Sequence, residues 1–123
     1  MATILVVEDN DDVREMMAVT LELEGHHAVT AANGREALDM LRRGLEPSLI
    51  LLDLMMPVMN GWDFKAAVEA DPVLRDIPIV VVSAGAGESV ARAAAQAFVA
   101  KPIDVERLLA VVGDYCEGTA GRV

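Results

Sequence analysis

Reactive polar side chains stand directly after four short apolar segments of the 123-residue chain. Glu8 and Asp9 follow the first of these segments, and Asp53 follows another. Carboxylates that come together repel one another, so either their pKa values rise or a cation neutralises them. A group of Asp and Glu without His or Cys favours a hard, oxygen-seeking ion such as Mg2+. If these side chains meet, they form a candidate magnesium site.

A hydroxyl and a lysine follow the two remaining segments. Ser83 comes after residues 79–82, and Lys101 comes after residues 97–100. A metal ion and a lysine can hold phosphate oxygens, and a hydroxyl can donate one more hydrogen bond. A carboxylate can itself be the nucleophile, which gives an aspartyl phosphate. Together these residue types indicate a site for phosphoryl chemistry.

The apolar segments have the composition of strands that are buried on both faces. They are short, rich in Val and Ile, and do not alternate with polar residues, which is typical of a parallel sheet. The strands predicted in this way are Ile4–Val7, Leu49–Leu52, Ile79–Val82 and Ala97–Ala100, with His27–Ala31 as a weaker candidate.

Helical patterns lie between these strands. Residues 13–21 repeat apolar side chains at helical spacing, with Asn10 or Asp11 as the cap and Gly25 as the C-terminal stop. Four more helices are predicted. The first begins at a capping box of Asn33 and Glu36, and the last follows a cap at Asp104. The two between them span Trp62–Ala70 and Glu88–Gln96.

The alternation of five strands with five helices predicts an α/β fold with a doubly wound, five-stranded parallel sheet. Strands separated by single helices require right-handed crossovers, and we expect helices on both faces of the sheet. With the strand order 2-1-3-4-5, the order reverses between residues 4–7 and 49–52, and ligands bind at such a reversal. These are the strands that the carboxylates follow, so the polar pattern and the topology support the same site.

The composition limits the classes of protein that remain. The chain has 10 Lys and Arg against 20 Asp and Glu, and its net charge of −10 argues against binding nucleic acid or an anionic membrane. The single cysteine excludes a disulfide framework and a four-ligand zinc site. The chain shows no secretory leader and no apolar stretch of about 18 residues. We expect one soluble, cytoplasmic domain.

Four segments of the chain form a specific signature when they occur together and in order. They are Ile4-Leu-Val-Val-Glu-Asp9, Leu51-Leu-Asp-Leu-Met-Met-Pro57 with Gly61, Val82-Ser-Ala84, and Phe98-Val-Ala-Lys-Pro102. At these residues the sequence closely resembles the receiver domain of two-component response regulators, which has a flavodoxin-like fold. The resemblance runs from about Thr3 to Cys116. It implies a receiver domain over residues 1–117 and a C-terminal tail over residues 118–123.

This resemblance implies a role for each matched residue. Asp53 is the phosphoacceptor, and Asp9 and Asp53 bind Mg2+, with Mn2+ as an alternative ion. Lys101 pairs with Asp53 or with its phosphate. The other implied roles are Glu8 as a metal ligand directly or through water, the Met55 backbone carbonyl as a metal ligand, Ser83 and Ala84 at the phosphate, Phe98 as a switch between outward and inward rotamers, and a cis Lys101–Pro102 bond.

The resemblance also implies the partners. A sensor histidine kinase or a histidine phosphotransfer protein supplies the phosphoryl group, and the domain catalyses only its own phosphorylation and dephosphorylation. The output is contact with a downstream protein through the face formed by residues 88–96, residues 97–100 and the helix after Asp104. We expect neither nucleic acid nor membrane as a partner, and a monomer or a weak dimer.

Structural roles stay open for individual residues, and other functions stay open for the whole chain. Glu8 and Asp9 can be acids that stabilise a helix N-terminus. Lys101 can be a loop lysine, Ser83 can begin a turn, and Phe98 can pack in the core. The alternative functions are a degenerate receiver that acts as a phosphorylation-independent interaction module, and a small phosphatase or phosphotransferase that acts on free substrates.

The residues two positions after Asp53 and Ser83 predict a long-lived phosphoryl group. Side chains at these positions tune phosphoryl lifetime in the family, and here they are Met55 and Gly85. Neither offers a polar group to position an attacking water, so we expect slow self-dephosphorylation. The measurement is retention of label on the purified phosphoprotein after the donor is removed. Fast loss of label with no phosphatase present would contradict this expectation.

Overall fold

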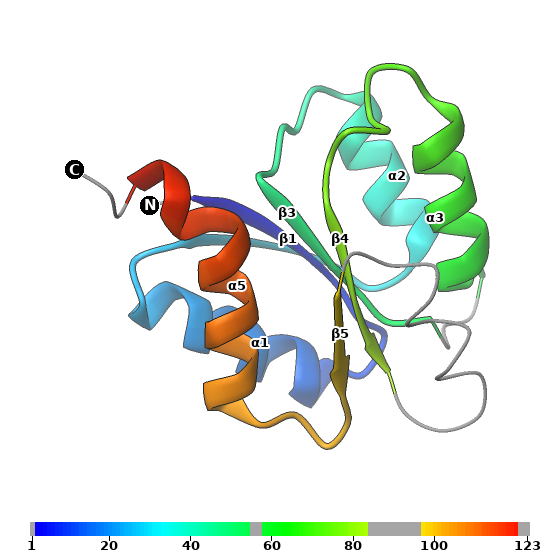
Figure 1. The fold of residues 1–123 in the computed structure, drawn as a ribbon. Helices are drawn as coiled ribbons and strands as arrows, with labels where there is room; N and C mark the ends of the chain where they lie inside the picture. Colours follow the sequence, from blue (N-terminus) through cyan, green and yellow to red (C-terminus); the bar gives the residue numbers. More distant parts are fainter. Residues whose placement is uncertain (1, 55–57, 84–96, 121–123) are drawn as a thin grey trace.

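All five predicted strands form one parallel sheet in the computed structural model, which describes residues 2–54, 58–83 and 97–120 (Figure 1). The observed order β2-β1-β3-β4-β5 confirms the predicted order. The strands are β1 (Thr3–Val7), β2 (His27–Ala31), β3 (Leu49–Leu52), β4 (Ile79–Ser83) and β5 (Ala97–Ala100), and the described helices are α1 (Asp11–Leu23), α2 (Gly34–Arg42), α3 (Gly61–Ala70) and α5 (Val105–Ala120).

The register of the strands brings their carboxyl ends to one edge of the sheet. Val7 of β1 lies beside Ala31 of β2 and Leu52 of β3, so three strands end at the same level. At the other side of the sheet, Ser83 of β4 pairs with Ala100 of β5. The polar residues that follow the strands in the sequence therefore gather at this edge, where open α/β sheets bind ligands.

The sheet separates two apolar cores, because successive side chains of a strand point to opposite faces. Leu5 and Val7 of β1 pack in the core that α2 and α3 cover, whereas Ile4 and Val6 pack in the core that α1 and α5 cover. Figure 1 shows the same division, with α1 and α5 on one side of the sheet and α2 and α3 on the other. Burial on both faces explains why the central strands carry no alternating polar residues.

Polar side chains cap α1 and α5 at the predicted residues. Asn10 accepts a hydrogen bond from the Val13 amide at 3.0 Å, and Asp104 accepts one from the Glu106 amide at 2.9 Å. Gly25, with a φ of +91°, follows the end of α1, as expected for a glycine that stops a helix. Each cap satisfies an amide that would otherwise lack an intrahelical partner.

The predicted capping box at α2 differs in one contact. Asn33 accepts a hydrogen bond from the Glu36 amide at 2.9 Å, as predicted. The Glu36 side chain, however, accepts from the Ala32 amide at 3.0 Å, one residue before the amide that a capping box uses. The contact therefore ties the end of β2 to the first turn of α2.

In the C-terminal third of the chain, one predicted helix cannot be compared with the structure, and another is longer than expected. The helix predicted over Glu88–Gln96 lies outside the described residues. Helix α5 continues to Ala120 and so includes the first part of the expected tail at residues 118–123. Within the described ranges, no helix is both long enough and apolar enough to cross a lipid bilayer.

Val58 holds a backbone conformation that is unfavourable for a β-branched residue. Its φ is +70°, and it is the one non-glycine residue with a positive φ in the described part of the chain. Left-handed backbone at a non-glycine residue costs about 1–3 kcal/mol. The Val58 side chain is 79% exposed, so little apolar burial offsets this cost.

Val58→Gly should therefore stabilise the fold by about 1 kcal/mol, because the strain removed exceeds the roughly 0.5–1 kcal/mol of added chain entropy in the unfolded state. The measurement is the free energy of unfolding in urea. Val73→Gly is a matched control, since Val73 is 83% exposed and has no positive φ, and this control should lose stability. A Val58→Gly protein that is less stable than the wild type would refute the strain.

Candidate functional site

The three predicted carboxylates meet at the carboxyl edge of the sheet. One oxygen from each of Glu8, Asp9 and Asp53 lies within 4.8 Å of the others. Glu8 and Asp53 are buried, whereas Asp9 is exposed. Asp9 therefore forms the side of this group that faces solvent.

Backbone hydrogen bonds between strands fix the two buried acids. The Glu8 amide donates to the Ala31 carbonyl at 3.1 Å, and the Asp53 amide donates to the Val7 carbonyl at 3.0 Å. These bonds continue the β1–β2 and β1–β3 ladders one residue past the end of each strand. The sheet therefore positions both carboxylates through their backbones, independently of what their side chains contact.

Lys101 supplies the positive charge that faces these acids. Its Nζ lies 2.8 Å from Glu8 Oε1 and 3.4 Å from Asp53 Oδ2. Burial alone would lower the pKa of Lys101, but the hydrogen bond and charge of Glu8, together with Asp53, outweigh it and raise the pKa above its ordinary value. The Lys101–Pro102 peptide bond is cis, the form that the family resemblance implies.

The turn that carries Asp9 is held by contacts to Glu8. The Asn10 amide donates to Glu8 Oε2 at 3.1 Å, and Arg14 Nη1 donates to the Glu8 carbonyl at 3.0 Å. Arg14 Nη2 also pairs with Asp11 Oδ1 at 2.6 Å. Nothing in the residue pattern singles out Arg14, apart from its place one helical turn after the cap Asn10.

Gly61 lets α3 begin directly against the backbone of Asp53. Its amide donates to the Leu54 carbonyl at 2.9 Å. A β-carbon at Gly61 would lie 2.5 Å from both the Asp53 carbonyl oxygen and the Leu54 Cα, which is closer than real atoms approach. Trp62 comes next in α3 and packs against the core on this face.

The structure places Ser83 at the carboxyl end of β4 and Phe98 further back in β5, beside Val81 of β4. Ser83 is the last residue of β4. Phe98 of β5 is 7% exposed and packs in the core that α2 and α3 cover, which is an inward position. The Phe98 carbonyl accepts a hydrogen bond from Arg107 Nη2 at 3.2 Å. Arg107, which the sequence pattern does not reveal, thus links β5 to the first turns of α5.

The donor atoms of this site suit a hard divalent cation. Among the described residues, three carboxylates lie around the Lys101 ammonium group, and carboxylates so close together favour a cation. Carboxylate oxygens without nitrogen or sulfur donors favour Mg2+ or Mn2+. The predicted Met55 carbonyl ligand and Ala84 lie outside the described residues.

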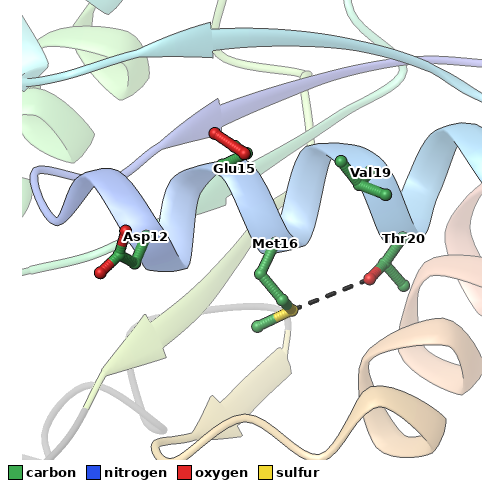
Figure 2. Close-up of a pocket in the computed structure, with 5 residues that line it drawn as sticks. All are labelled: Asp12, Glu15, Met16, Val19 and Thr20. Atoms are coloured by element: carbon green, nitrogen blue, oxygen red, sulfur yellow. Dashed lines mark hydrogen bonds between the residues drawn. The ribbon is translucent and has the colours of Figure 1, made fainter.

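A pocket along α1 is separate from the acids at the strand ends. Its volume is about 320 Å3, and Figure 2 shows its lining along one side of the helix. Two acids stand toward its N-terminal end, and the Thr20 hydroxyl lies 3.8 Å from Met16 Sδ further along. The lining residues are Asp12, Glu15, Met16, Val19 and Thr20. None of the predicted site residues lines it, so the candidate chemistry belongs to the strand edge and not to this pocket.

Comparisons with known proteins agree with one another. Residues 4–113 match the family model of the response regulator receiver domain. The polar-differentiation response regulator DivK of Brucella anthropi is 31% identical over 117 residues, which cover 92% of this chain and 94% of DivK.

Solved structures show the same similarity in three dimensions. The receiver domain of a signal transduction histidine kinase from Syntrophus aciditrophicus has a TM-score of 0.87 and 29% identity, with 100% of this chain and 95% of that one covered. The chemotaxis protein CheY4 of Vibrio cholerae has a TM-score of 0.83 and 30% identity, with 94% and 98% covered. These similarities confirm the predicted flavodoxin-like fold.

Lys101→Met should lower the free energy of unfolding by about 2 kcal/mol, because Glu8 and Asp53 lose the cation that faces them. The loss is smaller than for a fully buried pair because the Lys101 side chain is 22% exposed. Since folding raises the pKa of Lys101, its contribution is complete below the ordinary lysine pKa of 10.5 and falls as the pH rises through the higher folded value.

The measurement is urea unfolding of wild type and Lys101→Met at several pH values. The difference in unfolding free energy should be constant near pH 9 and shrink above about pH 10.5. Arg42→Met, which removes the same charge from an exposed position in α2, is the control and should show no such change. A Lys101 difference that stays constant to about pH 12 would contradict the raised pKa.

Proposed function

Because the chain belongs to the response regulator receiver domain family, we propose that it is a phospho-accepting switch with Asp53 as its phosphoacceptor. The observation that carries this proposal is the position of the Asp53 carboxylate. It is 4% exposed, lies 3.4 Å from Lys101, and shares the end of the central strands with Glu8 and Asp9. A phosphate can approach a group of three carboxylates only when cations offset the negative charge, and this site offers Lys101 and the donors for a metal ion.

In the proposed transfer, an oxygen of Asp53 attacks the phosphorus of a phosphohistidine on a kinase or phosphotransfer protein. The bond from phosphorus to Asp53 forms as the bond from phosphorus to nitrogen breaks, and the histidine leaves as neutral imidazole after taking up a proton. Lys101 lies 3.4 Å from Asp53, which supports a role for Lys101 in pairing with the phosphate oxygens. Asp9, Asp53 and the Met55 carbonyl would hold Mg2+ or Mn2+, with Glu8 in direct or water-mediated contact. The bound ion supplies charge neutralisation for the phosphate oxygens.

Phosphorylation of Asp53 would act on the output face through Ser83, Ala84 and Phe98. In this proposal Ser83 and Ala84 bind the phosphate, and Phe98 exchanges between its buried position and an outward one. The two positions define two populations, and the phosphate favours one of them. The surface that changes comprises residues 88–96, β5 and α5, and it contacts a downstream protein.

The proposed partners are proteins throughout. The relatives are named a polar-differentiation response regulator and a chemotaxis response regulator. We propose a histidine kinase or a histidine phosphotransfer protein as the donor, no binding of nucleic acid or membrane, and a monomer or weak dimer. The receiver would occupy residues 1–117 with residues 118–123 as its tail, and would catalyse only reactions of its own Asp53.

Incubation with Mg2+ and acetyl phosphate should add a single phosphoryl group, measured by intact mass. Asp53→Asn should abolish this adduct because the amide is not a nucleophile of this kind. Asp63→Asn, which neutralises an exposed acid in the first turn of α3, is the matched control and should keep it.

Two outcomes of the same experiment would contradict the proposal. No adduct with acetyl phosphate or with phosphoramidate would favour the degenerate receiver, an interaction module without phosphorylation. Steady consumption of the donor without any adduct on the protein would favour a phosphatase or phosphotransferase that acts on free substrates.

A further inference from the structure

The turn between β1 and α1 is short, and it carries the one exposed acid of the site. Glu8, Asp9 and Asn10 are the whole connection between the two elements. Glu8 is fixed by the sheet and Asn10 by its role as the cap of α1, so Asp9 lies between two anchored residues. The orientation of the Asp9 carboxylate toward Asp53 therefore depends on the peptide units on either side of it.

Arg14 bonds to one of these two peptide units. Its Nη1 donates to the Glu8 carbonyl at 3.0 Å, and that carbonyl belongs to the peptide that joins Glu8 to Asp9. The amide of Glu8 is already bonded to the Ala31 carbonyl, so the main chain is held on both sides of the Glu8 side chain. Rotation of the peptide that precedes Asp9 would break the arginine contact.

Arg14 also pairs with a neighbour outside the site. Its Nη2 pairs with Asp11 Oδ1 at 2.6 Å, and the Arg14 side chain is 21% exposed. One planar guanidinium thus spans the turn, from the carbonyl before Asp9 to the first residue of α1. Arginine is suited to this because its rigid fork donates in two directions at once, which a lysine ammonium on a flexible stem does not reproduce.

We propose that Arg14 is a positioning residue for the acidic metal site, acting on Asp9 through the Glu8 carbonyl. The inference rests on the proposed binding of Mg2+ by Asp9 and Asp53. A positioning role and a purely electrostatic role of Arg14 predict opposite changes in cation affinity when Arg14 is replaced. Removal of a positive charge near a cation site by itself strengthens cation binding. Loss of a positioning contact behind a ligand weakens metal binding, commonly by about 10-fold or more.

The test compares divalent-ion affinity in three variants of the full chain. Arg14→Met removes the fork and the charge, and Arg14→Lys keeps the charge but loses the fork. Arg42→Met makes the same change in net charge from an exposed site in α2, on the opposite face of the sheet from α1. Affinity is measured by titration of Trp62 fluorescence with MgCl2, and separately by electron paramagnetic resonance of free Mn2+.

Arg14→Met is expected to bind Mg2+ and Mn2+ about 10-fold more weakly than the wild type, Arg14→Lys is expected to be weakened as well, and Arg42→Met is expected to match the wild type. Labelling of Asp53 by acetyl phosphate should be slow in Arg14→Met at low Mg2+ and approach the wild-type rate at saturating Mg2+. Circular dichroism and thermal unfolding without metal show whether each variant is folded. If Arg14→Met does not fold, Arg14→Lys carries the comparison.

Equal or tighter ion binding in a folded Arg14 variant overturns the positioning role, and so does labelling that stays slow at saturating Mg2+. The failure of the proposed function looks different. A wild-type protein that binds no Mg2+ or Mn2+ at all, or binds it equally well as Asp53→Asn, overturns both the metal site and the role of Arg14.

Discussion

Electrostatic repulsion among three carboxylates at one edge of a sheet is the constraint on which this structure depends. Glu8, Asp9 and Asp53 lie within 4.8 Å of one another, and two of them are buried. Lys101 offsets part of this charge. The sheet opposes the rest of the repulsion that these acids exert on one another, because its ladders hold the Glu8 and Asp53 backbones in place and its apolar strands are buried on both faces. The fold therefore keeps these three carboxylates close to one another and beside Lys101.

The elements that position this cluster were predictable because their signals are local. A run of four or five apolar residues such as Ile4–Val7 marks a doubly buried strand without any knowledge of its neighbours. The residue after such a run lies at the carboxyl edge once the strands are parallel, and Glu8 and Asp53 were found in this way. Helix caps are equally local, because Asn10 and Asp104 bond amides only two or three residues away.

The features that were not predictable depend on how the folded chain brings segments and side chains together. Gly61 matched a family segment, but its close contact with the Asp53 carbonyl becomes evident only when α3 is folded back onto that strand end. Arg14 and Arg107 each reach a backbone carbonyl outside their own helix, and an arginine pattern does not reveal which carbonyl a long side chain will find. The positive φ of Val58 is also hidden, because a valine gives no signal of left-handed backbone. For Gly61, Arg14 and Arg107 the decisive partner is a backbone atom, and backbone atoms carry no sequence information.

The division of the interior by the sheet has a consequence for how this chain can change over evolutionary time. Substitutions that are well separated and share no neighbours have additive effects on stability. Met17 and Leu108 lie in one core, and Leu38 and Phe64 lie in the other, with the strands between them. A change of volume in one core therefore acts mainly on the neighbours in that core, and substitutions in the two helical layers are expected to add. Glu8 and Asp53 extend from strands whose side chains pack in both cores, so their positions depend on both layers.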